Sequence, residues 1–174
     1  VASGAWRTPC ESVDSVVRPW RFPPSGHSAF GPIRAAVYGG RGSAVEHNVT
    51  IACIAMIDTE AGIATAYDIM STPGLNGVYI GPADLALSLG LPAMGDQPQE
   101  EHLVVVNDLL AKCKAHRIAA GIHTSSLEYA QKYLALGFNF VTLGSDSGHM
   151  TKNAVKELAA ARGGVETQRE NTGY

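Results

Sequence analysis

The sequence predicts an α/β fold built on a parallel β-sheet. Segments of strand and helix character alternate along the 174 residues, and this alternation is typical of parallel strands joined by helices. Residues 50–58 form a nearly continuous apolar run, as expected for a strand buried on both faces in a parallel sheet. Each strand segment ends in polar residues, so functional side chains are expected at the carboxyl ends of the strands, where a (β/α)8 barrel carries its active site.

The first 50 residues are predicted to be mostly irregular. Residues 1–20 are interpreted as a short strand followed by a brief helix. Two prolines after Phe22 then interrupt regular structure. Residues 27–48 contain several glycine and proline breaks and are predicted to form a long loop with one helical turn near residues 33–37.

Strands and helices then alternate through the rest of the chain, which together with the strand and helix of residues 1–20 gives about five βα units. The apolar periodicity separates short strands from longer amphipathic helices. The predicted strands are residues 50–58, 78–81, 118–122 and 138–143. Five helices are predicted: one after residue 59, one that begins at residue 84, one at 100–116, one from residue 127 to a glycine cap at 137, and one at 151–162.

Composition excludes several classes of protein. The net charge is −3, from 13 basic and 16 acidic residues. Because no run of Lys or Arg occurs, nucleic acids and anionic membranes are not expected partners. The three cysteines are far apart without CxxC spacing, which argues against a disulfide framework or a zinc site. Without a spanning apolar segment or a signal-peptide profile, the expected location is cytoplasmic.

The stretch from Val78 to Gly90 is the centre of the functional prediction. It begins with an apolar run, which predicts a strand, and Gly81-Pro82 then predicts a tight turn. From Asp84 onward, leucines at helical spacing predict a helix. The backbone amides of Ala83 and Asp84 would then lie at a helix N-terminus, which favours an anion such as a substrate carboxylate. The alternative is that Asp84 is only a helix N-cap.

Two carboxylates on consecutive units indicate a metal site. Asp58 ends one predicted strand, where it shares a face with Met56, and Asp84 follows the next strand. Two carboxylates with open positions for water and an oxygen ligand suit Mg²⁺ or Mn²⁺. The alternative is that the two aspartates are separate helix caps.

Other chemistries find less support in the sequence. A glycosidase needs a sugar site, of which there is no other sign. No lysine ends a strand, which disfavours Schiff-base chemistry. Ser145, Asp146 and His123 have the residue types of a hydrolase triad, but there is no G-x-S-x-G motif. His123 is a candidate general base by its position at a strand end, with a surface residue as the alternative.

Four segments of the chain resemble the HpcH/HpaI aldolases, and the Gly81-Pro82-Ala83-Asp84-Leu85 motif is the most specific part. These segments are residues 21–26, 30–35, 77–85 and 140–146. The resemblance covers residues 4–160 approximately. It implies a (β/α)8 barrel, usually in a hexamer, that reversibly cleaves 4-hydroxy-2-oxo acids. The products are pyruvate or a related 2-oxo acid and an aldehyde, formed through a metal-stabilised enolate.

The resemblance also implies roles for individual residues. Asp84 matches the family's metal-binding aspartate, and Gly81, Pro82, Ala83 and Asp84 match its substrate-binding turn, whose Ala83 and Asp84 amides hold the carboxylate. The family binds Mg²⁺, Mn²⁺ or Co²⁺.

The second metal ligand departs from the family pattern. Asp58 falls at the position of the family's metal-binding glutamate, with Glu60 as the alternative ligand. An aspartate there is one methylene shorter. Met56 falls at the position of a substrate-contacting glutamine and lacks its donor.

The resemblance further implies that the chain begins at the fourth βα unit. The family's histidine base, its aspartate partner and its enolate-binding arginine would lie in the missing units, so the catalytic residues are unassigned. A whole barrel takes about 250 residues. We therefore expect one partial-barrel domain over residues 1–174, with a core at 4–162 and a frayed tail at 163–174.

The open edges of a partial barrel imply a homo-oligomer, a trimer or hexamer by resemblance, in which another chain covers the strands. The alternative function is a catalytically impaired homologue that acts only as a binding or oligomer-interface fragment.

Overall fold

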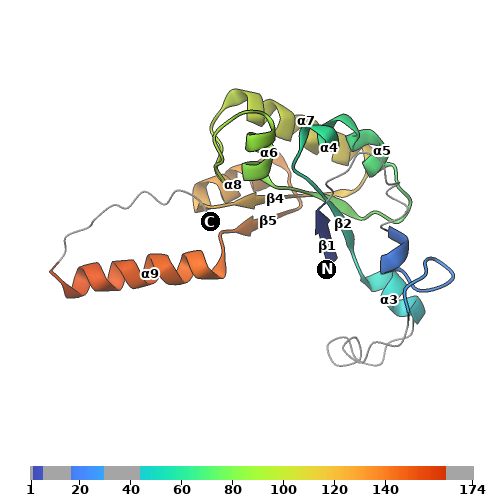
Figure 1. The fold of residues 1–174 in the computed structure, drawn as a ribbon, viewed down its shortest axis with the longest axis horizontal. Coiled ribbons are helices and arrows are strands. Elements are labelled where there is room, and N and C mark those ends of the chain that lie inside the picture. The colour runs from blue at the N-terminus through green and yellow to red at the C-terminus, as the bar shows by residue number, and fades with distance from the viewer. Residues whose placement is uncertain (1, 6–16, 30–43, 164–174) are drawn as a thin grey trace.

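The chain folds around a five-stranded sheet in which every neighbouring pair of strands is parallel (Figure 1). The computed structural model describes residues 2–5, 17–29 and 44–163. Strand order follows chain order: β1 (Ala2–Ala5), β2 (Cys53–Ile57), β3 (Gly77–Ile80), β4 (Ala119–Thr124) and β5 (Phe140–Leu143). The prediction of an α/β fold with a parallel sheet is therefore confirmed.

Helices connect the strands. They are α3 (Ala44–Thr50), α4 (Glu60–Ala64), α5 (Ala66–Met70), α6 (Pro82–Ser88), α7 (Glu100–His116), α8 (Leu127–Leu136) and α9 (Asp146–Ala161), with a short 3₁₀ turn, η1, at Arg18–Trp20. Figure 1 shows α4, α5, α6 and α7 on one side of the sheet. Among the helices of the described residues, none has the length and apolar character that crossing a bilayer requires.

Several predictions fall on parts of the chain that the structure does not describe. The predicted helix before residue 17, the helical turn near residues 33–37, and residues 164–174 of the predicted tail lie outside the described residues.

The two faces of the sheet differ in burial. The side chains of Ala55, Ile57, Val78, Ile80 and Ile122 are almost completely buried. The alternate side chains, which point to the other face, are half-buried or exposed. The predicted burial of residues 50–58 on both faces is therefore wrong, because only one face of β2 is fully buried.

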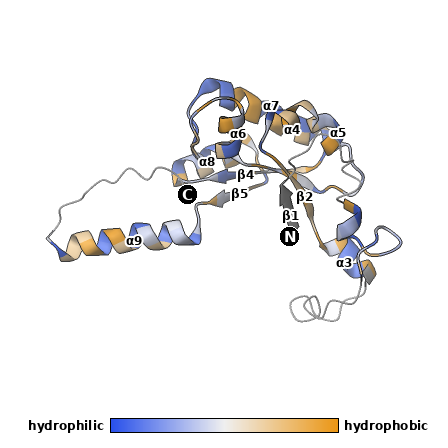
Figure 2. Cartoon of the chain, viewed as in Figure 1, coloured by the Kyte–Doolittle hydropathy of each residue, from blue (hydrophilic) through white to orange (hydrophobic). Residues whose placement is uncertain are grey.

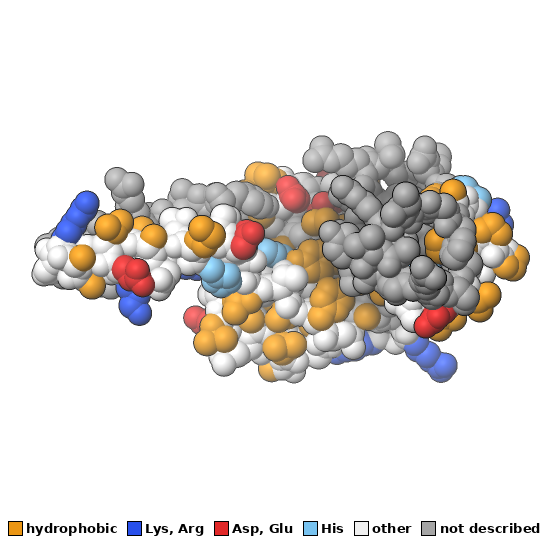
Figure 3. Space-filling model, turned by 90° about the horizontal axis from the view of Figure 1, so that it is seen from below, with side chains coloured by type: hydrophobic (Ala, Val, Ile, Leu, Met, Phe, Trp, Pro, Cys, Tyr) orange, Lys and Arg blue, Asp and Glu red, His pale blue; other side chains and the backbone are white. Residues whose placement is uncertain are grey.

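We call the second side of the sheet the open face, defined by Met56, Tyr79, His123, Phe140 and Thr142. Register places Tyr79 of β3 beside Gly121 of β4, and Gly121 beside Phe140 of β5. Figure 3 views the molecule from below, on the side away from α4 to α7, and shows hydrophobic side chains with histidines among them. The part of this face that is visible in Figure 3 thus carries both apolar side chains and histidines.

The segment before β2 is helical, where a loop was predicted. Thr50 ends α3 instead of beginning a strand, and residues 44–48 are part of that helix. The cause is a distant contact. The Asn48 side chain accepts a hydrogen bond from the Phe22 backbone N–H at 2.7 Å and donates one to the Phe22 carbonyl at 2.9 Å.

Two more helix boundaries differ from the prediction for local reasons. The helix after residue 59 is divided into α4 and α5 at Thr65, whose hydroxyl donates to the Ala61 carbonyl at 2.8 Å. Helix α9 begins at Asp146, five residues before the predicted start, because the Ser145 hydroxyl accepts a hydrogen bond from the Gly148 N–H and caps the helix.

Helix α9 extends away from the sheet (Figure 1). None of its residues is buried, and the side chains of Met150, Val155 and Leu158 are exposed. Figure 2 shows hydrophobic residues interspersed with hydrophilic ones along this helix. The helix therefore offers apolar surface that the described part of the chain does not bury.

Helix α7 confirms the predicted span of residues 100–116 and buries an unexpected histidine. His102 is completely buried, whereas its neighbour Leu103 is half-buried. The His102 Nε2–H donates to the carbonyl of Pro82 in α6 at 3.2 Å. Nδ1 of His102 has no hydrogen-bond partner among the described residues. Burial lowers the pKa of His102, and the hydrogen bond to Pro82 opposes that shift in part.

We expect His102 to make the fold sensitive to acid. Because its pKa is lowered in the folded chain, the unfolded chain takes up a proton first. The stability that neutral His102 contributes is complete above the ordinary histidine pKa of about 6.5. It is lost as the pH falls from there toward the lower pKa of the folded state. Urea unfolding midpoints should therefore fall more steeply with acid in the wild type than in His102→Gln.

The control for this experiment is His149→Gln, because His149 is exposed. This variant should keep the wild-type pH dependence. Equal pH dependence of the unfolding midpoint in the wild type and His102→Gln would show that His102 does not cause the sensitivity to acid.

Gly121 allows two aromatic rings to lie across β4. The rings of Tyr79 and Phe140 stack with centroids 5.9 Å apart and planes 12° apart. A Cβ atom at Gly121 would overlap three carbons of the Phe140 ring. The absence of a side chain at Gly121 therefore lets Phe140 rest directly on the strand.

Replacing Gly121 by alanine should destabilise the protein by about 1–3 kcal/mol, the usual cost of overpacking. Urea unfolding measures this loss. Adding Phe140→Leu to the Gly121→Ala variant should recover part of it, because the smaller side chain can make room for the new methyl group. An unchanged free energy of unfolding in Gly121→Ala would show that the ring does not rest on this strand.

Candidate active site

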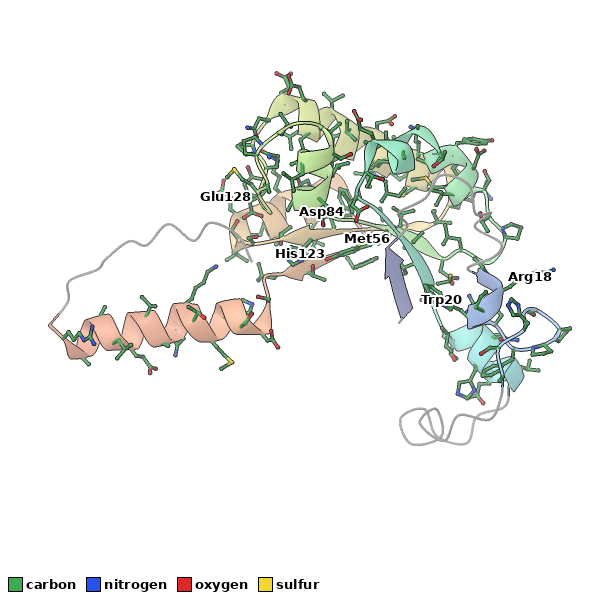
Figure 4. The ribbon with its side chains drawn as sticks, in the orientation of Figure 1. Arg18, Trp20, Met56, Asp84, His123 and Glu128 are labelled. Atoms are coloured by element: carbon green, nitrogen blue, oxygen red, sulfur yellow. The ribbon has the colours of Figure 1, made fainter. Side chains whose placement is uncertain are left out.

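The carboxyl ends of β2, β3 and β4 are aligned at one edge of the sheet. Ile57, Ile80 and Ile122 are register partners in neighbouring strands. The residues that follow them are Asp58, Gly81 and His123, which therefore come next to one another along the same edge. Figure 4 labels Met56, Asp84 and His123 in the same central part of the molecule.

Gly81 is the point of closest approach between β2 and β3 at this edge. A Cβ atom at Gly81 would lie 2.5 Å from Met56 Cε and 3.4 Å from Asp58 Cβ. Met56 and Asp58 therefore share a face, as the strand alternation predicted. Asp58 is nearly buried, with 9% of its surface exposed. Any side chain at Gly81 would displace the methionine from this position.

Helix α6 starts directly after this close approach. Gly81 is the N-cap and Pro82 is the first helical residue, a position that suits proline because it needs no N–H there. Asp84 lies in the first turn, three residues after the N-cap. The alternative in which Asp84 is the N-cap is therefore wrong. Asp84 is exposed, whereas Ala83 is buried, and the first amides of the helix lack intrahelical partners.

The carboxylates of Asp58 and Asp84 come from consecutive βα units, and both residues lie near Gly81. Asp58 adjoins Gly81 in space, and Asp84 follows Gly81 by three residues. Within residues 2–5, 17–29 and 44–163, no group of three or more His, Cys, Asp or Glu side chains is arranged to hold a metal. A cation here would need further oxygen ligands from water or substrate.

Glu60, the alternative to Asp58, lies at the other end of α6. Its backbone N–H donates to the hydroxyl of Ser88 at 2.7 Å, and Ser88 is the last residue of α6. Asp84 lies in the first turn of the same helix. The structure therefore brings Asp58, rather than the Glu60 backbone, to the end of α6 that carries Asp84.

His123 forms a polar cluster with Tyr79 and Thr142, which we call the hydroxyl–imidazole cluster. His123 Nδ1 lies 2.7 Å from Thr142 Oγ1 and 3.2 Å from Tyr79 Oη. Tyr79 Oη lies 2.5 Å from Thr142 Oγ1. Burial raises the pKa of Tyr79, and its hydrogen bond to Thr142 opposes the shift in part. Sequence reasoning singled out His123 but missed its two partners, although strand alternation places Tyr79 on the same face.

The three residue types of a hydrolase triad are not assembled. The Ser145 hydroxyl accepts from the Gly148 N–H, and the Asp146 carboxylate accepts from the Ser147 N–H at 2.6 Å, so both serve the start of α9. The His123 ring instead contacts the hydroxyls of Tyr79 and Thr142.

Comparison with known proteins connects this geometry to a family. The family model HpcH/HpaI aldolase/citrate lyase matches residues 10–153. A hydroxypyruvate/pyruvate aldolase of Rhizorhabdus wittichii is 33% identical over 81% of this chain and 56% of its own length. A 4-hydroxy-2-oxovalerate aldolase of Rhodococcus jostii is also 33% identical, over 84% of this chain and 56% of its own length. The chain thus spans little more than half the length of these relatives.

Solved structures of HpcH/HpaI proteins are also similar to this chain. An HpcH/HpaI aldolase/citrate lyase family protein from Burkholderia cenocepacia superposes with a TM-score of 0.77 at 27% identity, covering 92% of this chain and 64% of that one. An HpcH/HpaI aldolase from Desulfitobacterium hafniense has a TM-score of 0.80 at 16% identity, covering 99% and 65%, and supports the fold alone. From its sequence match and its fold, the chain belongs to the HpcH/HpaI aldolase/citrate lyase family.

Proposed function

We propose that the chain is part of a metal-dependent carbon–carbon lyase that reversibly cleaves 4-hydroxy-2-oxo acids. The products would be pyruvate or a related 2-oxo acid and an aldehyde. The observation that carries the proposal is that Asp58 adjoins Gly81 in space and Asp84 follows Gly81 by three residues, at the carboxyl edge of a parallel sheet. Two relatives at 33% identity are named as aldolases of pyruvate and of 4-hydroxy-2-oxovalerate.

The donor set fits a hard divalent cation. Two carboxylates from Asp58 and Asp84 leave coordination positions for water and for two oxygens of a 2-oxo acid, and oxygen-only coordination suits Mg²⁺, Mn²⁺ or Co²⁺. When bound, such an ion supplies electrostatic stabilisation of the enolate. The chain's own part is to supply the two carboxylates, one from the buried Asp58 and one from the exposed Asp84.

The turn from Gly81 to Asp84 is the proposed substrate-binding segment. Its backbone approaches a ligand closely because Gly81 has no side chain and Pro82 fixes the start of α6. The amides of Ala83 and Asp84 would donate to the substrate carboxylate. Met56 would form an apolar wall beside Gly81.

In the proposed enzyme, the five βα units are the second part of a (β/α)8 barrel. The open face would then line the barrel interior, which explains why its side chains are half-buried here. The proposed assembly is a homo-oligomer, a trimer or hexamer. The exposed Met150, Val155 and Leu158 of α9 support this proposal because they form apolar surface suited to a subunit contact.

A second candidate is a catalytically impaired homologue that binds 2-oxo acids or subunits without turnover. The observation that favours it is the methionine at position 56, which covers Gly81 and cannot donate a hydrogen bond. A measurement of substrate turnover distinguishes the two candidate functions, because only the first predicts it.

The first test is lyase activity with and without a metal. Retro-aldol cleavage of a 4-hydroxy-2-oxo acid and decarboxylation of oxaloacetate should occur with Mn²⁺ and stop with EDTA. Asp84→Asn should lower both rates by about 10²-fold or more, as the loss of an electrostatic group in an active site commonly does. Asp68→Asn, at an exposed position on α5, is the control and should keep the wild-type rate. Metal-dependent binding without turnover would favour the second candidate, and turnover unaffected by EDTA would refute the metal mechanism.

The second test concerns the length of the side chain at position 58. Asp58→Glu extends the carboxylate by one methylene toward the proposed ion, so Mn²⁺ should bind more tightly than in the wild type. Asp58→Asn should bind Mn²⁺ more weakly because the charge is lost. Titration of free Mn²⁺ by electron paramagnetic resonance measures both affinities. Identical affinities in all three proteins would remove Asp58 from the metal site.

A further inference from the structure

The hydroxyl–imidazole cluster holds the ring of His123 through one of its two nitrogens. Nδ1 lies 2.7 Å from Thr142 Oγ1 and 3.2 Å from Tyr79 Oη. Nε2 lies on the opposite side of the imidazole and has no hydrogen-bond partner among the residues that the structure describes. The ring is thus oriented by its neighbours, with Nε2 available to a ligand.

The hydrogen bonds of the cluster assign the ring proton to Nε2. If Tyr79 donates to Thr142 and Thr142 donates to Nδ1, both hydroxyl hydrogens have an acceptor within the cluster and the ring carries its hydrogen on Nε2. If Nδ1 is the donor instead, one of the two hydroxyl hydrogens has no acceptor within the cluster. The first arrangement makes more hydrogen bonds, so Nε2–H is a donor.

The direction of this donor is fixed by the sheet. Tyr79, His123 and Thr142 come from β3, β4 and β5, which are paired in register. The Tyr79 ring is itself held by its stack with Phe140, at 5.9 Å between centroids. Groups carried by paired strands are placed more precisely than groups on loops, which is what a selective binding site requires.

The surroundings of His123 on the open face are short of donors. The side chains of Met56 and Phe140 have no polar hydrogen, and the hydroxyl hydrogens of Tyr79 and Thr142 are used inside the cluster. Within the open face, Nε2–H is therefore the donor that remains for a ligand. An oxygen atom placed there would accept a hydrogen bond, whereas a methyl group would separate Nε2–H from water without replacing its acceptor.

His123 lies beside the proposed substrate-binding turn. It comes one residue after Ile122, the register partner of Ile80, and Gly81 comes one residue after Ile80. Adjacent strands are about 4.8 Å apart, so the end of β4 is one strand spacing from the turn. The imidazole can therefore contact the part of a bound substrate that extends from the turn toward β4.

We propose that His123 is a specificity-determining residue, whose Nε2–H donates a hydrogen bond to an oxygen substituent of the substrate. This inference deepens the proposed function and rests on it. The site then favours a substrate with a hydroxyl group at the point that reaches β4 over the same substrate with a methyl group there. Because His123 is half-buried rather than enclosed, the preference is that of one ordinary hydrogen bond, about three- to tenfold.

The hydroxyl group can belong to the 2-oxo acid or to the aldehyde part of the substrate, and two matched pairs distinguish these sources. Hydroxypyruvate and 2-oxobutanoate carry a hydroxyl and a methyl group on C3, and their affinities with Mg²⁺ are measured by calorimetry. Similarly, 4,5-dihydroxy-2-oxopentanoate and 4-hydroxy-2-oxohexanoate carry a hydroxyl and a methyl group on C5. These are compared by kcat/KM, or by affinity if the chain does not cleave them.

Replacing His123 by leucine should remove the preference in one of the two pairs. The ratio of hydroxyl to methyl compound should fall by about three- to tenfold relative to the wild type, because the donor is lost. Affinity for pyruvate, which has neither substituent, should stay within about threefold and shows that the fold and the turn are intact. His149→Leu, at an exposed position on α9, should keep the wild-type ratios.

The other two members of the cluster provide an independent check. Thr142→Val removes the hydroxyl that donates to Nδ1 at nearly constant volume, so the ring proton is no longer held on Nε2 and the preference should decrease. Thr142→Ser should keep it, which a purely steric role of Thr142 would not explain.

The outcomes separate this inference from the proposed function. A change in the first pair shows that His123 contacts the 2-oxo acid, and a change in the second pair shows that it contacts the aldehyde part. Ratios that are equal in the wild type and His123→Leu for both pairs, with Mg²⁺-dependent pyruvate binding intact, would overturn the role of His123 alone. Absence of Mg²⁺-dependent pyruvate binding in the wild type would overturn both.

Discussion

The parallel register of β2, β3 and β4 is the constraint on which the rest of the site depends. Ile57, Ile80 and Ile122 are paired in register and have at most 1% of their surface exposed, so the helix-covered core fixes the relative positions of the three strands. Because side chains alternate along a strand, the following residues face the opposite side of the sheet. Burial of the three isoleucines therefore also places Asp58 and His123 on the open face at the same edge, one on each side of Gly81.

Two glycines shape the open face by the side chains that they lack. Gly81 lets Met56 and Asp58 approach β3, and Gly121 lets the ring of Phe140 lie flat on β4. The first glycine leaves space at the proposed carboxylate and metal site, and the second supports the aromatic pair that orients the hydroxyl–imidazole cluster. At both positions the absence of a Cβ atom thus lets a neighbouring side chain pack directly against the backbone.

The features predicted correctly from the sequence are those with a local cause. Apolar periodicity is a property of neighbouring residues, so the alternation of strands and helices, the span of α7 and the glycine cap at Gly137 were all predictable. Features that depend on distant residues were not. Helix α3 is held by Asn48 and Phe22, which are 26 residues apart, and the contact between Tyr79 and Thr142 joins residues 63 apart. Asp84 was predictable as a residue of the turn, but its place within α6 depends on where the helix begins.

The central claim is that Asp58 and Asp84 hold one cation beside the turn at Gly81. Anomalous diffraction from crystals soaked with Mn²⁺ and pyruvate locates the metal directly. The account predicts a single strong Mn²⁺ peak within coordination distance of both carboxylates, with pyruvate between the metal and the start of α6. A peak that contacts neither aspartate, or only one of them while the other carboxylate points away, would contradict it.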